Sequence, residues 1–230
     1  MRTSKLLIFF IVLMFFSCKK EVKDIDKTEY MGYDYFPYNI GHELIYEVDS
    51  TYYDDFDIIQ KEKKFHFYIK EVIESYFQDN EGRQNIRIER YKRDKDTDNW
   101  SIKDVWSGVI TNTSAQRFEE DERFVKLAFP IKETQSWNGN AYNNLNSQTY
   151  TYKDLFVDFN IDSELYSNTV TVNQAEDTSL IHRNIISEVY APKIGMIYKT
   201  YNVVKKAVNG DIISGSIYEY KLISYNMGTE

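Results

Sequence analysis

The sequence has one cysteine, three prolines and nine glycines among 230 residues. One cysteine cannot form a disulfide within the chain, so the stability of the fold must come from a packed core. Few prolines and glycines, together with 20 tyrosines and 14 phenylalanines, exclude a low-complexity or collagen-like chain. Basic side chains are also few, 28 against 36 acidic ones, and the net charge of −8 argues against a nucleic-acid partner.

The N-terminus has the pattern of a signal peptide. Arg2 and Lys5 precede an uninterrupted apolar run over residues 6–16. This run is shorter than the ~20 residues that a transmembrane helix needs, and it is typical of the apolar region of a signal sequence.

The single cysteine, Cys18, follows this run directly. Residues 15–18, Phe-Phe-Ser-Cys, resemble a bacterial lipobox, with Phe15 where leucine is usual. The resemblance implies that residues 1–17 are removed and that Cys18, as the new N-terminus, carries a diacylglycerol inserted in the membrane. The alternative is an ordinary signal peptide or an uncleaved anchor in which Cys18 has no role.

Residues 18–33 are charged and show no sustained apolar period, so they are predicted to be a flexible tether. The Lys-Lys-Glu start of this tether fits either a solvated linker or a surface-export signal of Bacteroidota lipoproteins, which leaves the periplasmic and the surface face open. Removal of residues 1–17 lowers the net charge from −8 to −10, because the positive charges of Arg2 and Lys5 are lost. Residues 34–230 have the length of one domain.

The alternation of apolar and polar side chains predicts β-strands. In residues 42–53 one face is predicted to be apolar and the other polar: Leu44, Tyr46, Val48 and Tyr52 on the first, and Glu47, Asp49 and Thr51 on the second. Residues 63–77 and 85–93 repeat the pattern on either side of Asp-Asn-Glu-Gly, which predicts a hairpin.

A second hairpin is predicted for residues 196–208 and 212–225, with a tight type I′ turn at Asn209-Gly210. A helical turn is weakly indicated within residues 173–185. The predicted fold class is mainly β, a curved antiparallel sheet or open β-barrel with at most one short helix. Further strands are expected near residues 100–113, 115–129, 148–158, 167–174 and 183–191.

Two segments carry a family resemblance. Residues 35–50, YFPYNIGHELIYEVDS, and residues 188–204, EVYAPKIGMIYKTYNVV, resemble the opening and closing motifs of a family of Bacteroidota outer-membrane lipoproteins without an assigned activity. The chain departs from that family at Leu44, where tryptophan is usual, and at Lys193, where glycine is common. The resemblance implies an outer-membrane location and, by analogy, the curved sheet of periplasmic lipid-binding proteins.

No motif in the sequence indicates catalysis or a cofactor. The three histidines, His42, His66 and His182, have no partner at metal-ligand spacing, and His66 is expected on an exposed strand face. No nucleophile elbow, phosphate-binding loop, dinucleotide fingerprint or zinc-protease motif occurs. We therefore predict no catalytic residues, no metal and no cofactor, although an acidic pair of a glycosidase could escape notice.

Three weaker features have two interpretations each. Consecutive acids at residues 54–55 and 119–122 could bind Ca²⁺, but a solvated loop is the commoner role of such runs. Ser50, in Asp-Ser-Thr, matches a Bacteroidota O-glycosylation pattern, or it is an ordinary strand residue. Trp100, Trp106 and Trp137 could line a sugar- or lipid-binding surface, whereas core packing is the usual role of tryptophan in a β-rich domain.

Together these features predict a lipoprotein anchored to the outer membrane through Cys18. Its domain is expected to act by binding, as an accessory subunit with an envelope protein as partner, and not as an enzyme. The alternatives are a carrier of an apolar ligand or lipid in a β cavity, and a lipoprotein hydrolase. An apolar cavity would favour the carrier.

Overall fold

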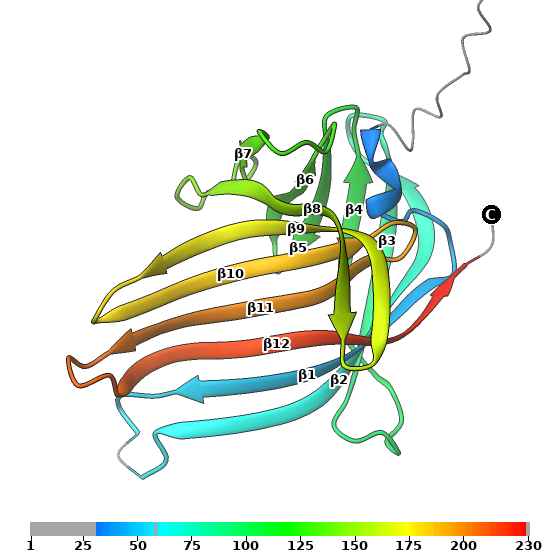
Figure 1. Ribbon diagram of the computed structural model, residues 1–230. Helices are drawn as coiled ribbons and strands as arrows, with labels where there is room; N and C mark the ends of the chain where they lie inside the picture. Colours follow the sequence, from blue (N-terminus) through cyan, green and yellow to red (C-terminus); the bar gives the residue numbers. More distant parts are fainter. Residues whose placement is uncertain (1–30, 58, 229–230) are drawn as a thin grey trace, which may run out of the picture.

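The computed structural model describes residues 31–57 and 59–228, so Cys18 and most of the predicted tether lie outside the described residues. The described residues form one 12-stranded sheet in which every neighbouring pair of strands is antiparallel (Figure 1). Their helical element is η1, one short 3-10 turn. The elements are η1 (Tyr33–Tyr35), β1 (His42–Tyr53), β2 (Glu62–Gln78), β3 (Gln84–Arg93), β4 (Ser101–Ile110), β5 (Ser114–Glu119), β6 (Glu122–Ala128), β7 (Ser136–Asn138), β8 (Thr149–Ile161), β9 (Glu164–Thr178), β10 (His182–Ala191), β11 (Gly195–Lys206) and β12 (Ile212–Met227).

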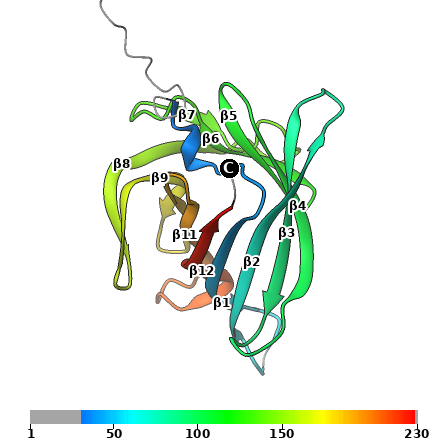
Figure 2. The same cartoon turned by 90° about the vertical axis from the view of Figure 1, so that its right-hand side faces the viewer.

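The sheet curls into a nearly closed barrel. Neighbours in the sheet are consecutive in the chain except that β1 pairs with β12, which leaves β6 and β7 as the two edges. The backbone N–H of Val125 donates to the carbonyl of Gly139 at 2.9 Å, and Trp137 Nε1 donates to the carbonyl of Val125 at 2.9 Å. These bonds bring the two edges together, and Figure 2 shows the resulting ring of strands. The predicted fold class is confirmed.

The apolar core fills one end of the barrel. On β1 the side chains of Leu44, Tyr46 and Val48 are buried, as the alternation in the sequence predicted. Tyr46 lies opposite Ile69 of β2 and Leu222 of β12, so the inward rows of three strands meet. η1 packs at this end. The other core residues include Tyr35, Phe36, Ile73, Ile86, Ile88, Ala115, Leu127, Phe129, Tyr190 and Ile197.

The strands have very unequal lengths. β2 and β12 contain 17 and 16 residues, whereas β5, β6 and β7 contain 6, 7 and 3. The long strands therefore run on beyond the short wall, as Figure 1 shows for β9 to β12, β1 and β2. The interior of the barrel, here called the lumen, opens beyond the turn between β5 and β6.

One strand predicted over residues 115–129 is instead a hairpin of β5 and β6. Its turn is made by Glu120 and Asp121, whose φ angles are 48° and 67°. Two consecutive positive φ angles are the geometry of a type I′ turn. The sequence does not predict this turn, because glycine or asparagine usually occupies such positions and neither is present at residues 120 and 121.

Two further local predictions were wrong. Residues 173–185 hold no helix: β9 continues to Thr178, and the Ser179 hydroxyl then accepts the backbone N–H groups of Ile181 and His182 in a turn before β10. At the second hairpin only Gly210 of the Asn-Gly pair has a positive φ, 95°. Ala207 N–H donates to Asp211, and Gly210 N–H to Ala207, so the loop is longer than a two-residue type I′ turn.

Candidate functional site

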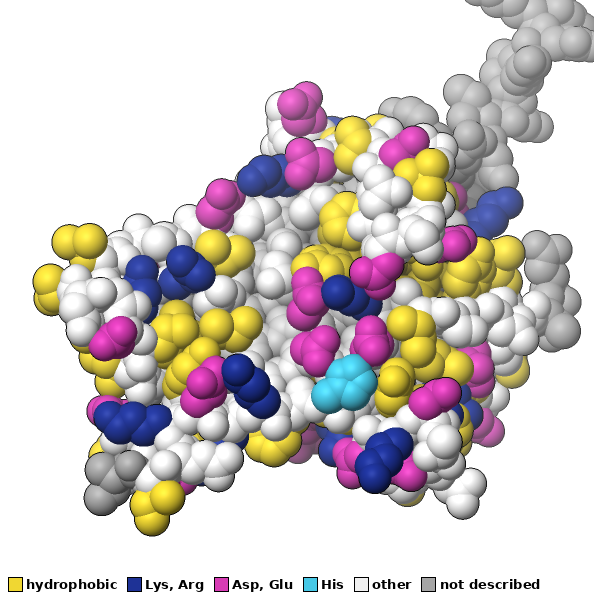
Figure 3. Space-filling model, turned by 60° about the horizontal axis from the view of Figure 1, so that its bottom comes forward, with side chains coloured by type: hydrophobic (Ala, Val, Ile, Leu, Met, Phe, Trp, Pro, Cys, Tyr) yellow, Lys and Arg dark blue, Asp and Glu magenta, His cyan; other side chains and the backbone are white. Residues whose placement is uncertain are grey.

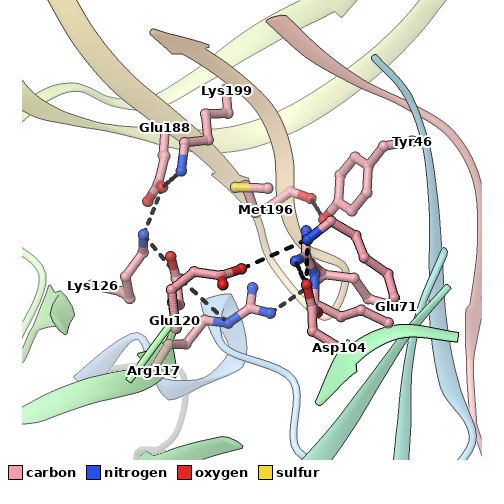
Figure 4. A network of polar contacts seen from close by, with 12 residues as sticks. Tyr46, Glu71, Asp104, Arg117, Glu120, Lys126, Glu188, Met196 and Lys199 are labelled. Carbon is pink, nitrogen blue, oxygen red and sulfur yellow. Dashed lines mark hydrogen bonds and ion pairs between the residues drawn. The ribbon is translucent and has the colours of Figure 1, made fainter. Parts of the chain in front are cut away.

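Charged side chains occupy inward-facing positions on strands that are otherwise apolar. On β2 the side chains of Ile69, Glu71 and Ile73 point the same way, because successive residues of a strand alternate between its faces, and all three are buried. The same alternation places Arg90 in line with Ile88 on β3. The charged network in the lumen comprises Glu71, Arg90, Lys103, Asp104, Arg117, Glu119, Glu120, Lys126, Glu188 and Lys199, several of which Figure 4 labels.

Glu71 is the centre of one half of this network. Arg90 Nε donates to Glu71 Oε1 at 2.9 Å, and Arg117 Nη2 donates to Glu71 Oε2 at 2.8 Å. Arg90 also contacts both carboxylate oxygens of Asp104, at 3.0 and 3.1 Å. The guanidinium carbon of Arg90 lies 3.4 Å from the ring centre of Trp106, which is cation–π geometry. Both oxygens of a buried carboxylate are thus bound by arginine.

Glu188 is the centre of the other half. This fully buried carboxylate accepts hydrogen bonds from Lys126 at 2.6 Å, Lys199 at 3.0 Å and the Tyr190 hydroxyl at 2.7 Å. Lys126 Nζ also lies 3.4 Å from Glu119 Oε1. Because Lys126 belongs to β6 and Glu188 to β10, this ion pair connects opposite walls of the barrel (Figure 4).

The network holds its own groups in their charged forms. Burial opposes ionisation of Glu71, but Arg117 and Arg90 outweigh it and lower the pKa of the carboxyl. Burial likewise opposes ionisation of Glu188, and Lys126 and Lys199 still lower its pKa. For Lys199 the attraction of Glu188 exceeds the cost of burial, so the pKa of the ammonium is raised. None of these shifts brings a pKa toward neutrality.

Three cavities with both charged and aromatic side chains in their linings lie near the β5–β6 turn. A cavity of about 540 Å³ shares Trp106 and Glu120 with a second cavity of about 290 Å³. That second cavity shares Lys199 and Tyr218 with a third of about 290 Å³. We call the third cavity the outer lumen pocket; its lining includes Phe124, Tyr150, Gln174, Lys199, Tyr201 and Tyr218.

A mainly apolar cavity also exists, beneath η1. It is lined by side chains such as Phe36, Leu44, Ile73 and Met196, and its volume is about 40 Å³. Pockets for small molecules usually have ~300 Å³ or more. This space is therefore too small for a lipid chain.

Four tyrosines form a ladder along the lumen wall from β11 to β1. The rings of Tyr201 and Tyr218 are stacked, with centroids 4.5 Å apart and planes 2° from parallel. Tyr218 meets Tyr220 edge to face at 5.9 Å, and Tyr220 meets Tyr46 at 5.8 Å. Tyr46 donates its hydroxyl to the carbonyl of Met196 at 2.8 Å. The hydroxyls of the other three have no hydrogen-bond partner within the described part of the chain.

The outer surface seen in Figure 3 has no comparable organisation. Acidic and basic side chains are interspersed there with patches of hydrophobic side chains, and a histidine lies beside several acidic side chains. His66 is exposed, as predicted, and its Nδ1 lies 2.9 Å from Asp49 Oδ1. On this face no field of one charge marks a binding surface.

The residues singled out from the sequence are scattered. Cys18 lies outside the described residues. Ser50 is half-buried on β1, between Phe65 and Tyr218 on the neighbouring strands, and its O-glycosylation stays a prediction. In residues 31–57 and 59–228 no group of three or more His, Cys, Asp or Glu could hold a metal ion. No helix in the described ranges is long and apolar enough to cross a membrane.

Some of the tryptophans and acidic residues singled out from the sequence pack in the core or face the lumen, and others are exposed. Trp137 packs against Tyr150 and Tyr152, with ring centroids 6.0 and 4.7 Å apart, as a core tryptophan would. Trp106 instead faces the lumen, where it lines the cavity beside Arg90 and Lys199. In the run 119–122, Glu119 points into the charged network. Glu120 and Asp121 are exposed at the turn, and Glu120 belongs to the network only through its ion pair with Lys103 at the edge.

Sequence reasoning missed the charged network itself. The signal was present in the strand parity: Glu71 follows Phe67 and Ile69 at two-residue steps, and Arg90 follows Ile86 and Ile88. A charged residue on the apolar face of a strand must be paired when the strand is buried. That parity would have identified individual members of the network but not their partners.

Comparisons with known proteins add little to this description. No protein-family model matches the chain, and no curated protein matches it. One similar solved structure is described as an exported protein with a YmcC-like fold, from Bacteroides fragilis; it has a TM-score of 0.43 and 10% identity, over 83% of this chain and 98% of that chain. Another, from Parabacteroides distasonis, is described as a lipoprotein; it has a TM-score of 0.44 and 11% identity, over 84% of this chain and 98% of that chain. At TM-scores below 0.5 these similarities carry no conclusion about the present protein.

Proposed function

We propose that this protein is a lipoprotein anchored to the outer membrane of a bacterial envelope, and that its β domain acts by binding, as an accessory subunit of an envelope complex. The anchor rests on the charged, apolar and Ser-Cys order of residues 1–18. The outer-membrane location rests on the resemblance of residues 35–50 and 188–204 to Bacteroidota outer-membrane lipoproteins. Lys193, where that family commonly has glycine, has a positive φ of 64°, the conformation that glycine adopts most readily.

The observation that carries the binding role is the self-neutralised lumen. A general acid or base at neutral pH needs a pKa shifted toward 7. Here the arginines and lysines lower the pKa values of Glu71, Glu119 and Glu188, which keeps these carboxylates ionised. Such a lumen is suited to holding a fixed pattern of charge, and it supports binding better than it supports the hydrolase alternative.

The carrier of an apolar ligand is also less well supported. Charged and hydroxyl-bearing side chains, among them Lys199 and Tyr218, contribute to the lining of the two cavities of about 290 Å³, and an apolar ligand would leave these groups without water or hydrogen-bond partners. The apolar cavity beneath η1 has only about 40 Å³. A polar ligand or a protein partner fits these surfaces better.

The anchor is tested by Cys18→Ala, with Ser17→Ala as the matched control that keeps the thiol. We expect the Cys18 variant to leave the membrane fraction, because the thiol is the site of lipid attachment, and the control to stay. Mass spectrometry should find a diacylglycerol on the wild type. Wild-type protein without an acyl group, together with a Cys18 variant that resists a carbonate wash, would show that the anchor is wrong.

The accessory role is tested by affinity capture of the full chain from solubilised outer membranes. The proposal requires one envelope protein in a constant ratio to the captured chain, before and after a salt wash. Recovery of the chain alone in repeated captures would contradict the role of accessory subunit.

A further inference from the structure

We propose that the outer lumen pocket binds a neutral saccharide, with a sugar ring against the exposed faces of its aromatic side chains. This inference rests on the proposal that the domain acts by binding, and it assigns a ligand class to one pocket. Four aromatic side chains, Phe124, Tyr150, Tyr201 and Tyr218, contribute to the lining of this pocket; Tyr150 is buried, so the accessible ring surface belongs to the other three. Aromatic rings offer flat apolar surfaces against which the C–H face of a sugar ring can pack.

The polar groups of the outer lumen pocket that have no protein partner in the described part of the chain suit a ligand that both donates and accepts hydrogen bonds. Gln174 is buried, with 6% of its surface exposed, and its Nε2 has no partner among the described residues. The hydroxyls of Tyr201 and Tyr218 and the carboxylate of Glu122 have no protein partner there either, but these three residues are half-buried and not fully enclosed. A hydroxyl group is both donor and acceptor, so a polyhydroxylated ligand can satisfy the amide and the carboxylate together.

The charges of the pocket disfavour a charged ligand. Lys126 and Lys199 already contact Glu188, at 2.6 and 3.0 Å, so an anionic ligand would have to compete with buried carboxylates. A cationic ligand could pair with Glu120 or Glu122 at the rim, but deeper in the pocket it would meet the same two ammonium groups. Glu188 raises the pKa of Lys199 against the effect of burial, and the ammonium beside Tyr218 therefore stays protonated. A neutral ligand avoids both costs.

The outer lumen pocket has room for a sugar ring and lies beside a second cavity. The pocket has about 290 Å³, at the lower end of the range for small-molecule sites, and it shares Lys199 and Tyr218 with the next cavity. In that next cavity Trp106 Nε1 is a further buried donor without a partner among the described residues. A chain of several sugar rings could therefore extend from the outer lumen pocket toward Trp106.

The test uses the purified full chain in detergent and calorimetric titration with defined tetrasaccharides. The neutral probes are cellotetraose, maltotetraose and N-acetylchitotetraose; the charged probes are tetragalacturonate and the deacetylated chitosan tetramer; laurate is the apolar probe. We expect at least one neutral probe to bind with a dissociation constant of about 1 mM or tighter, and more tightly than any charged or apolar probe. Absence of binding by all three neutral probes, or tighter binding of a charged probe or of laurate, would overturn the inference.

Two variants locate the site. Tyr201→Ala removes half of the stacked pair, and Gln174→Leu removes the unpaired amide while keeping a side chain of similar size. Each should weaken the neutral probe about tenfold or more, whereas Tyr142→Ala, at an exposed loop ring outside the pocket, should not. Circular dichroism checks that each variant is folded, and if Tyr201→Ala is not, Gln174→Leu alone decides. Unchanged affinity in a folded Gln174→Leu variant would place the ligand elsewhere and contradict the assignment.

These outcomes are separable from the proposed function. A protein partner captured by a chain that binds no neutral probe would contradict only the saccharide inference. Saccharide binding by a chain that captures no partner would contradict only the accessory-subunit role.

Discussion

The buried carboxylate of Glu188 is the most sensitive single position that the structure identifies. Glu188→Gln keeps the size of the side chain but removes the negative charge that Lys126 and Lys199 share. Lys126 retains Glu119 at 3.4 Å, whereas Lys199 loses its one ion pair among the described residues and keeps only the weaker attraction of Glu119. A charge left unpaired in a buried site costs about 3–5 kcal/mol. Because the amide oxygen of the new side chain can still accept one hydrogen bond, we expect the lower end of that range, about 3 kcal/mol.

The assay is urea unfolding of the purified chain, followed by circular dichroism. With a urea dependence of about 2–3 kcal/mol per molar for a domain of this size, the midpoint should fall by about 1 M or more. The matched control is Glu176→Gln, which removes an exposed carboxylate 3.4 Å from Lys153 and should cost less than about 1 kcal/mol.

A double-mutant cycle separates the charge from the packing. Lys199→Met removes the orphaned ammonium, so the pair of substitutions should cost about 2 kcal/mol less than the sum of the two single ones. Two results would refute this reasoning: a cost of Glu188→Gln no larger than that of Glu176→Gln, or additive costs of Glu188→Gln and Lys199→Met. Either would show that the Glu188–Lys199 ion pair does not contribute to stability as its distance indicates.

Three other outcomes follow from the same structure. The arginine and lysine partners of Glu71, Glu119 and Glu188 lower the pKa values of these carboxyl groups despite burial. The stability that the three carboxylates contribute should therefore be complete above about pH 5 and decline as the pH falls below about 4.5. A urea midpoint that rises on acidification would refute this sign. Gly210→Val should lower stability by about 1 kcal/mol or more, since φ is 95° there, whereas Gly210→Asn should cost less; equal midpoints for the two variants would contradict the strain. The full chain should show no turnover of esters, peptides or common glycans above a control without protein, and turnover abolished by changing one lumen carboxylate to its amide would overturn the binding role.

The strands of this protein were largely readable in its sequence because side-chain alternation is a local property. The predicted strand at residues 42–53 has the same bounds as β1, and the predicted turn around residues 79–82 joins β2 to β3. Errors occurred where a turn lacked its usual residues, as at Glu120 and Asp121, or where an amphipathic pattern was too weak to decide, as in residues 173–185.

The sequence by itself therefore determined which segments are strands and which of their faces are apolar. Only the tertiary structure decided which charges meet. Lys126 and Glu188 are 62 residues apart, and Arg117 and Glu71 are 46 apart. Their contacts depend on the closure of the barrel, which sets the strands facing each other across the lumen, and on a type I′ turn that ends the short wall. Alternation fixes the direction of each side chain relative to its own strand, but the partner across the lumen depends on the register and curvature of the whole sheet.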